Sequence, residues 1–374
     1  MDTSQIFLTP PVADGICKNL TFQEANSVRL ALNFSELNCS VPVRDLNQQI
    51  LFFNKVNNLT VEAAKSIEKF GSNHALIDFA SKGNLEMVKL LVNSGANVGH
   101  ISAWTKKDPV TSALAPPFSQ NKLKIVEFLV EKGADVNRNY ENSFSLLHWA
   151  VVYGHSQIVE FLLAKEAEVN RIDGKRNTAL MLTYADNYLE SAKLLIQYGA
   201  DISLTNRSGK TALMLAAEYN DDLDIFKFLF DQAATQENFN IDQTDNDRET
   251  ALSLAAIKGR LNIVKFLVSH GANVNHVNAN GLTPLMMASL TGYSDTIKFL
   301  LEKGANINAV TPEGKTSLMF AVINGRIGLV KILLENEPIK VDIHAVDRDG
   351  QTALMMAENL GFSNIVQLLK FYGA

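Results

Sequence analysis

The sequence predicts an all-α solenoid, in which short pairs of helices repeat along the chain and stack on one another. Two observations predict this fold class. The first is a repeat of about 33 residues, which a leucine marks near the start of each unit. The second is a Gly or Asn at fixed distances after that leucine. The marker leucines are Leu76, Leu114, Leu147, Leu180, Leu213, Leu252, Leu285, Leu318 and Leu354.

The glycines and asparagines predict where the helices of each unit end. Gly and Asn best accept the left-handed backbone that terminates a helix. The first stop follows the marker leucine by two helical turns, at Gly83, Asn121, Gly154, Asn187, Asn220, Gly259, Gly292, Gly325 and Gly361. The second stop comes near the end of the unit, at Gly95, Gly133, Gly199, Gly271, Gly304 and Gly373. Other residues stand at this second position in three units, Glu166, Gln232 and Glu337. Because the last two precede insertions, we expect remodelled helix ends there.

Each unit is therefore predicted to contain a short helix, a tight turn, a longer helix and a loop. The longer helix includes segments such as IVEFLV (125–130) and IVKFLV (263–268), which are apolar on most sides. A helix of this kind must be covered on several faces. One unit cannot supply that cover, whereas stacked neighbours can, so the units are expected to form an array.

The repeated pattern closely resembles the ankyrin repeat family. The resemblance is carried by residues 145–150 (SLLHWA), 281–285 (GLTPL) and 133–137 (GADVN). It implies helix–turn–helix units joined by β-hairpin-like fingers and stacked into a curved solenoid. Residues 73–374 would hold about nine repeats. Residues 1–72 would form a helical N-terminal region, in which residues 43–72 are a degenerate repeat that caps the stack.

Two departures from the family pattern lead to local predictions. The family's histidine after the marker leucine is kept only as His148, and methionine replaces it at Met181, Met214, Met286, Met319 and Met355. Methionine fills the same space without a strong polar atom, so we expect poorer hydrogen bonding between repeats. In the second repeat, Pro116 and Pro117 follow the marker leucine closely. Proline disrupts a helix interior, so that first helix should be broken or replaced by a turn.

Three insertions interrupt the period, at residues 99–108, 233–247 and 336–344. Insertions into a solenoid map to loops on one face, which is often the binding face. The alternative is that these are surface loops without a role, since loops vary freely.

Composition excludes several classes of protein. The net charge is −6, from 34 basic and 40 acidic residues, which argues against a general binder of nucleic acid or of anionic membranes. No apolar run approaches the length that spans a bilayer, and no secretory signal is visible. The two cysteines, Cys17 and Cys39, fit a reducing compartment. We therefore expect a cytoplasmic protein, and a monomer.

No catalytic or metal-binding motif is present. The seven histidines show no metal-ligand spacing, and the glycines form no phosphate-binding loop. We expect no cofactor, no metal ion and no enzymatic activity. Two alternatives stay open: a Cys-dependent enzyme that uses Cys17 or Cys39 in the N-terminal region, or the regulatory ankyrin half of a larger enzyme.

A solenoid without pocket chemistry offers an extended surface to another protein. The resemblance implies that finger tips and the ends of the first helices line a concave binding face. Tyr and Arg are frequent in interface hot spots, and apolar residues at such positions need a cover. The predicted contact residues are Tyr140, Val152, Tyr153, Lys175, Arg176, Arg207, Lys210, Tyr219, Arg248, Ile257, Leu290 and Ile323.

The basic members of this set would meet an acidic segment of the partner. The alternative is that scattered surface charge has no role. Two finger asparagines, Asn137 and Asn170, resemble sites that asparaginyl hydroxylases modify in ankyrin proteins. The alternative is that these asparagines simply belong to the repeat pattern.

The abundance of Asn, and of Lys over Arg, is common in AT-rich genomes. Together with the Met-rich repeats, it resembles bacterial ankyrin effectors that act on a eukaryotic host protein after secretion into the host cytosol. The competing class is an endogenous adaptor.

Overall fold

The structure is a computed structural model, and it describes residues 71–103, 105–117, 119–140, 143–184, 188–220 and 223–374. The chain divides into two compact units after Glu168, and each is described by itself. The predicted capping repeat at 43–72, except its last two residues, lies outside the described residues. So do Cys17 and Cys39.

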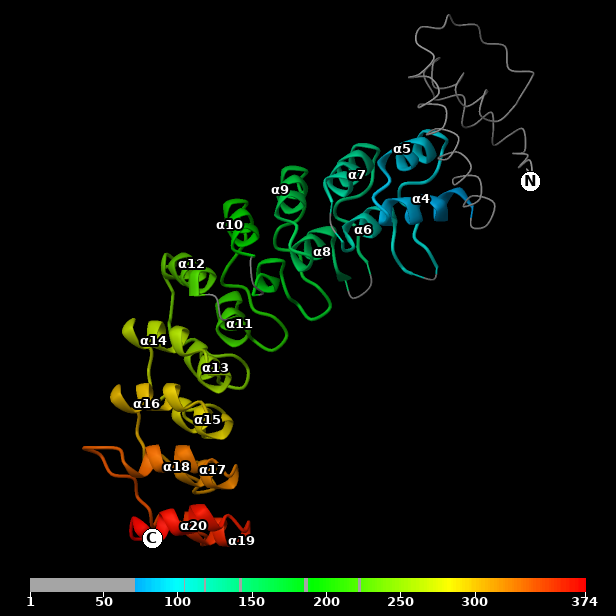
Figure 1. The fold of residues 1–374 in the computed structure, drawn as a ribbon. Helices are drawn as coiled ribbons and strands as arrows, with labels where there is room; N and C mark the ends of the chain where they lie inside the picture. Colours follow the sequence, from blue (N-terminus) through cyan, green and yellow to red (C-terminus); the bar gives the residue numbers. More distant parts are fainter. Residues whose placement is uncertain (1–70, 104, 118, 141–142, 185–187, 221–222) are drawn as a thin grey trace, which may run out of the picture. The chain divides into compact units, whose positions relative to one another are not determined.

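The first unit contains three helix pairs within its described residues. They are α4 (Ser72–Ser81) with α5 (Leu85–Asn93), α6 (Pro109–Leu114) with α7 (Gln120–Glu131), and α8 (Leu146–Val152) with α9 (Ser156–Ala164). The first helices α4, α6 and α8 pack in one layer, and the second helices α5, α7 and α9 pack in another (Figure 1).

The second unit contains six pairs among its described residues, with its first helices in one layer and its second helices in another (Figure 1). They are η2 (Leu180–Leu182) with α10 (Leu189–Gln197), α11 (Ala212–Tyr219) with α12 (Leu223–Ala234), α13 (Ala251–Lys258) with α14 (Leu261–Ser269), α15 (Pro284–Thr291) with α16 (Ser294–Glu302), α17 (Ser317–Ile323) with α18 (Ile327–Leu334), and α19 (Ala353–Asn359) with α20 (Ser363–Phe371). The predicted all-α repeat fold is confirmed.

Capping side chains explain where the first helices begin. In the second unit a threonine precedes each α-helix of this layer and accepts the N–H of the third helical residue, as Thr283 does from Met286 at 3.3 Å. Thr211, Thr250, Thr316 and Thr352 act in the same way. A hydroxyl at this position satisfies a backbone donor that has no partner inside the helix.

The predicted left-handed residues are found at every glycine of both sets. Glu166 adopts the same conformation with φ 62°, although it carries a side chain. The prediction was wrong at two asparagines. Asn121 lies inside α7, because that helix begins earlier after its marker leucine than its counterparts do. Asn220 has φ −105°, an extended conformation, and Asn187 lies outside the described residues.

The prolines end the first helix of the second repeat as predicted. Helix α6 stops at Leu114, directly before Ala115 and the two prolines. Two side chains cap its last carbonyls: His155 Nε2 lies 3.0 Å from the Leu114 oxygen, and Lys122 Nζ donates to the Ala115 oxygen. The turn that replaces the missing part of the helix is therefore held by polar contacts from α7 and from the start of α9.

The helix ends beside the insertions are remodelled as predicted. Helix α12 runs past Gln232 to Ala234, and α18 ends at Leu334, before Glu337. The fingers are turns. The described residues contain a single antiparallel bridge, between Val346 and Thr352, and no strand.

Candidate interaction surface

Five fingers of the second unit are each built on an Asp or Asn side chain that accepts two backbone N–H groups. Asp173 Oδ1 accepts from Lys175 N at 2.8 Å and from Asn177 N at 2.7 Å. The same turn forms at Asn206, Asp245, Asn278 and Asp347. Such side chains stabilise turns because they replace backbone acceptors. These hydrogen bonds fix the backbone of the turn in each of these five fingers.

Neighbouring fingers are joined through their backbones. Arg207 N donates to the Lys175 oxygen at 2.9 Å, and Asn246 N donates to the Ser208 oxygen at 3.0 Å. Asn246 Nδ2 also donates to the Arg207 oxygen at 3.0 Å. The tips of three successive fingers in the second unit are therefore held at fixed spacing.

A second set of contacts, the asparagine ladder, joins successive repeats below the tips. Asn170 Nδ2 donates to the Gly199 oxygen at 3.1 Å, and its Oδ1 accepts from Asp201 N at 2.8 Å. Asn137, Asn275 and Asn308 make the same pair of bonds to the repeats that follow them. These amides supply hydrogen bonds between repeats away from the methionine positions.

In the first unit, two of the three predicted contact residues are tied to neighbouring side chains. The Tyr140 hydroxyl donates to Asp108 Oδ2 at 2.6 Å. Burial and the Asp108 carboxylate both raise the pKa of Tyr140. Tyr153 is half-buried and its ring stacks on Trp149 at 5.5 Å between centroids. Val152 is half-buried as well. Tyr140 thus braces its own finger, and Tyr153 offers one edge of a stacked aromatic pair.

In the second unit the predicted basic residues fall into two kinds. Lys175, Arg176, Arg207 and Arg248 are exposed on finger tips. Lys210 instead forms an ion pair with Glu218, whose side chain is nearly buried. The charge of Lys210 is thus neutralised inside the repeat, while the other four cations face solvent.

Tyr219 lies at the end of α11 with 48% of its surface exposed. Its ring contacts Tyr184 at 5.2 Å between centroids, and Lys258 Nζ lies 5.7 Å from the Tyr219 centroid. The predicted apolar patch is less exposed than expected: Ile257 and Leu290 are half-buried, and Ile323 is 37% exposed. Each of the half-buried residues is partly covered within its own stack.

Sequence reasoning missed Tyr184 and Tyr293 at this surface. Tyr293 is 42% exposed and follows Gly292 directly. The position after the first glycine stop covers the corresponding glycine of the preceding repeat, as Tyr293 covers Gly259. An alignment of the repeats could have found Tyr293. Tyr184 could not be found in this way, because the short helix η2 shifts the turn that follows it.

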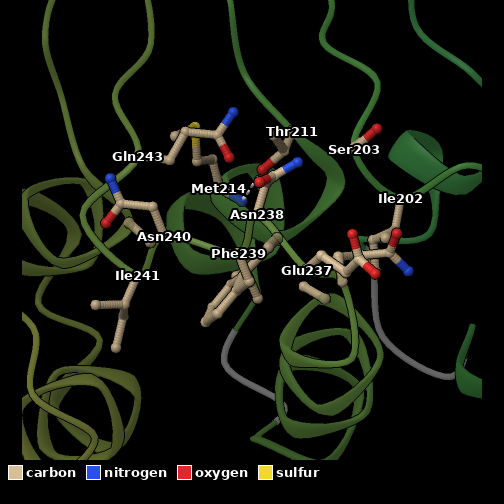
Figure 2. Close-up of a pocket in the computed structure, with 14 residues that line it drawn as sticks. Ile202, Ser203, Thr211, Met214, Glu237, Asn238, Phe239, Asn240, Ile241 and Gln243 are labelled. Carbon is tan, nitrogen blue, oxygen red and sulfur yellow. Dashed lines mark hydrogen bonds between the residues drawn. The ribbon is translucent and has the colours of Figure 1, made fainter.

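The insertion at 233–247 borders a pocket of about 370 Å³. Figure 2 shows Phe239 in its middle, with Glu237 and Ile202 on one side and Ile241 on the other. The Phe239 ring meets Phe230 edge-on at 5.3 Å. The pocket lies where Ser203 stands in place of a ladder asparagine. A serine is too short for the two bonds that Asn170 makes.

The described residues hold no group of three or more His, Cys, Asp or Glu side chains that could bind a metal ion. Among the helices of the same residues, none is long and apolar enough to cross a membrane.

A family model for ankyrin repeats, which spans three copies at a time, matches residues 76–173, 147–240, 232–311 and 308–374. These matches cover both units and suggest a role in protein–protein interaction. A comparison with curated proteins gives no match. The matched residues and the stacked helix pairs agree, and the chain belongs to the ankyrin repeat family.

Proposed function

We propose that the chain is a scaffold that binds a partner protein on the face formed by its finger tips and the ends of its first helices. The observation that carries this proposal is the cluster of Tyr184, Tyr219 and Lys258. The Tyr219 ring contacts both of the other side chains and still exposes 48% of its surface. An aromatic ring held by its neighbours loses little conformational entropy when a partner covers it.

Affinity capture from cell lysate, with identification by mass spectrometry, tests the proposal. We expect Tyr219→Ala to lower the recovery of a specific partner at least several-fold, because truncation of an interface tyrosine commonly costs more than 1 kcal/mol. Adding Tyr153→Ala and Arg207→Ala should remove it. Tyr198→Ala is the matched control, since Tyr198 is 40% exposed but caps the end of α10 in the other layer. Equal recovery with the triple variant and with wild type would reject this face.

The partner we propose is a eukaryotic host protein, met by a secreted bacterial effector in the host cytosol. Support comes only from the composition and from the Met-rich repeats. A reporter-translocation assay tests it, and failure of translocation with intact partner binding would favour an endogenous adaptor. We also propose that the protein is monomeric and not an enzyme. Unusually fast alkylation of Cys17 or Cys39 would instead support the cysteine-dependent alternative.

Asn137 and Asn170 are also proposed as hydroxylation sites. Both amides already act as donor and acceptor between repeats, and a hydroxyl on the β-carbon would leave these bonds chemically possible. Intact-mass measurement after incubation with an asparaginyl hydroxylase tests this, and no gain of one oxygen would exclude it.

A further inference from the structure

Two arginines occupy a finger position at which four other fingers have glycine. The position requires a left-handed backbone, and Gly209, Gly281, Gly314 and Gly350 adopt it with φ between 72° and 79°. In the fingers at 173–177 and 245–249 the same position is Arg176, with φ 63°, and Arg248, with φ 59°. The local sequence thus places a long charged side chain where the backbone favours a residue without one.

A left-handed conformation is strained for any residue with a β-carbon, and glycine avoids this strain. Within the described residues, neither arginine side chain forms an ion pair, and both are exposed. No ion pair of these side chains therefore offsets the strain. Residues held in strained conformations cluster at functional sites, so Arg176 and Arg248 point to a role outside the fold.

On these fingers most carboxylates are buried or half-buried, whereas most cationic side chains are exposed to solvent. The carboxylates of Asp173 and Asp245 are buried and accept the N–H groups of their own turns. Over the three joined fingers, at 173–177, 206–210 and 245–249, a single carboxylate is exposed, that of Asp247. Four cations face solvent beside it: Lys175, Arg176, Arg207 and Arg248.

We propose that these three fingers bind an extended acidic segment of a partner protein, with Arg176, Arg207 and Arg248 as the contacts to successive carboxylates. Arginine binds a carboxylate through two parallel hydrogen bonds, which makes the pair directional. The backbone bonds between Arg207 and Lys175 and between Asn246 and Ser208 fix the spacing of the fingers before binding. This inference rests on the proposed scaffold function and names the chemistry of the partner.

A nucleic acid fits the same surface less well. The three fingers carry no aromatic residue on which a base could stack. Asp247 lies among the cations, and the whole chain has a net charge of −6, which opposes a continuous phosphate backbone. Separate carboxylates on a peptide can avoid Asp247, whereas regularly spaced phosphates cannot.

Fluorescence anisotropy at low ionic strength tests the proposal with the whole chain. The probe is a short labelled peptide of alternating Glu and Ser, and the comparison probes are a Gln–Ser peptide of equal length and an oligothymidine of equal charge. Arg176→Gly and Arg248→Gly restore the glycine found in other fingers, so they remove charge and strain together. Two controls are available. Ser143→Gly relieves the same strain at φ 59° without changing charge, and Arg348→Gln removes an exposed finger arginine outside the three fingers.

We expect wild type to bind the Glu–Ser peptide and not the Gln–Ser peptide. Each of Arg176→Gly, Arg248→Gly and Arg207→Gln should weaken that binding about fivefold or more. The melting temperature of the two glycine variants should stay the same or rise by a few degrees. Ser143→Gly and Arg348→Gln should bind as wild type does.

Three results would overturn the proposal: no preference for the Glu–Ser peptide, full binding by the double glycine variant, or tighter binding of oligothymidine, which would indicate a nucleic-acid site. The scaffold function is tested separately. If the finger variants lose nothing while Tyr219→Ala still loses its captured partner, this inference fails and the scaffold function stands.

Discussion

Gly259 lies at a close approach between two repeats of the second unit. Its φ is 70°, and a β-carbon built there would lie 2.3 Å from Cδ1 of Tyr293. Two separate requirements therefore select glycine, the left-handed backbone and the space that the tyrosine ring occupies. Gly361 has a similar φ of 72°, but a β-carbon there would meet no atom within 4 Å.

Gly259→Ala is expected to destabilise the protein by about 3 kcal/mol, because backbone strain adds to overpacking against Tyr293. Gly361→Ala should cost only about 1 kcal/mol, the strain alone. Urea denaturation followed by circular dichroism compares the two free energies of unfolding. Equal losses in the two variants would show that the Tyr293 contact does not matter.

His155 makes the stability of the protein depend on pH. Burial lowers the pKa of His155 below its usual 6.5, the hydrogen bond to the Leu114 carbonyl opposes this shift, and the charge of Lys122 adds to it. In the pH range just below 6.5 the unfolded chain therefore binds more protons at His155 than the folded chain does. The free energy of unfolding must fall as the pH falls through this range.

We expect His155→Gln to reduce this loss of stability in acid. A glutamine amide can donate to the Leu114 oxygen but does not titrate. Some loss should remain, because burial, and secondarily the charge of His74, also lower the pKa of His100. Urea unfolding monitored by tryptophan fluorescence, at about pH 7.5 and about pH 5.5, gives the comparison. An unchanged difference between the two pH values would contradict this role of His155.

At the residue scale, the sequence predicted the glycines that a left-handed backbone requires. It did not predict side-chain contacts between residues that lie far apart along the chain. Every glycine stop was correct, because φ is a local property. Asn220 was wrong, since asparagine tolerates the left-handed conformation without requiring it. Among the predicted contact residues, the tie between Tyr140 and Asp108 joins positions 32 residues apart, which no local pattern reports.

The asparagine ladder is the feature that joins one helix pair to the next. Asn275 Nδ2 donates to the Gly304 oxygen at 3.2 Å, and Asn275 Oδ1 accepts from Asn306 N at 2.7 Å. Two bonds from one side chain thus connect the loops that follow α14 and α16. The repeat pattern showed the asparagine, but the position of its amide depends on how the pairs stack.

Asn275→Ala should lower the free energy of unfolding by about 2 kcal/mol, because two hydrogen bonds between repeats are lost. Asn238→Ala is the control, since Asn238 is an exposed asparagine in the insertion at 233–247 and should change stability little. Thermal unfolding by calorimetry measures both. If the ladder hydrogen bonds do not contribute to stability, Asn275→Ala and Asn238→Ala will have equal melting temperatures.

Over the whole molecule, stability is expected to be a sum of contacts between neighbouring repeats. Helix α16 packs against both α14 and α18, whereas α20 packs against α18 alone in its layer. The last pair accordingly exposes large apolar side chains: Met355, Leu360 and Phe371. Met319, which stands one repeat earlier at the position of Met355, is 1% exposed.

Hydrogen exchange with mass spectrometry should therefore find faster exchange in α20 than in α16. The two helices have the same length, 9 residues, so intrinsic fraying is comparable. The lower protection follows because, within the described residues, α20 has one neighbouring helix in its layer whereas α16 has two. Equal protection in α16 and α20 would indicate that the second unit unfolds as a single cooperative block.

The fold class could be predicted from the whole sequence because the repeat of about 33 residues recurs many times along the chain. Each copy supports the same register, so local errors such as Asn121 do not change it. The charged surface was only partly predictable. Sequence identified the four exposed cations, but the burial of Asp173 and Asp245 and the pairing of Lys210 with Glu218 depend on folded turns.

The asparagine-ladder contact of Asn308 shows how two repeats stay joined when an insertion lies between them. Asn170 and Asn275 bond to a backbone N–H that lies 31 residues further on, whereas Asn308 bonds to Asp342 N, 34 residues further on. Asn308 still makes the same pair of hydrogen bonds as the other ladder asparagines, because the additional residues form a loop that precedes Asp342. A foreign epitope or reporter grafted between Asn336 and Lys340 should therefore be displayed without separating the two repeats, which makes this loop the natural entry point for engineering the scaffold.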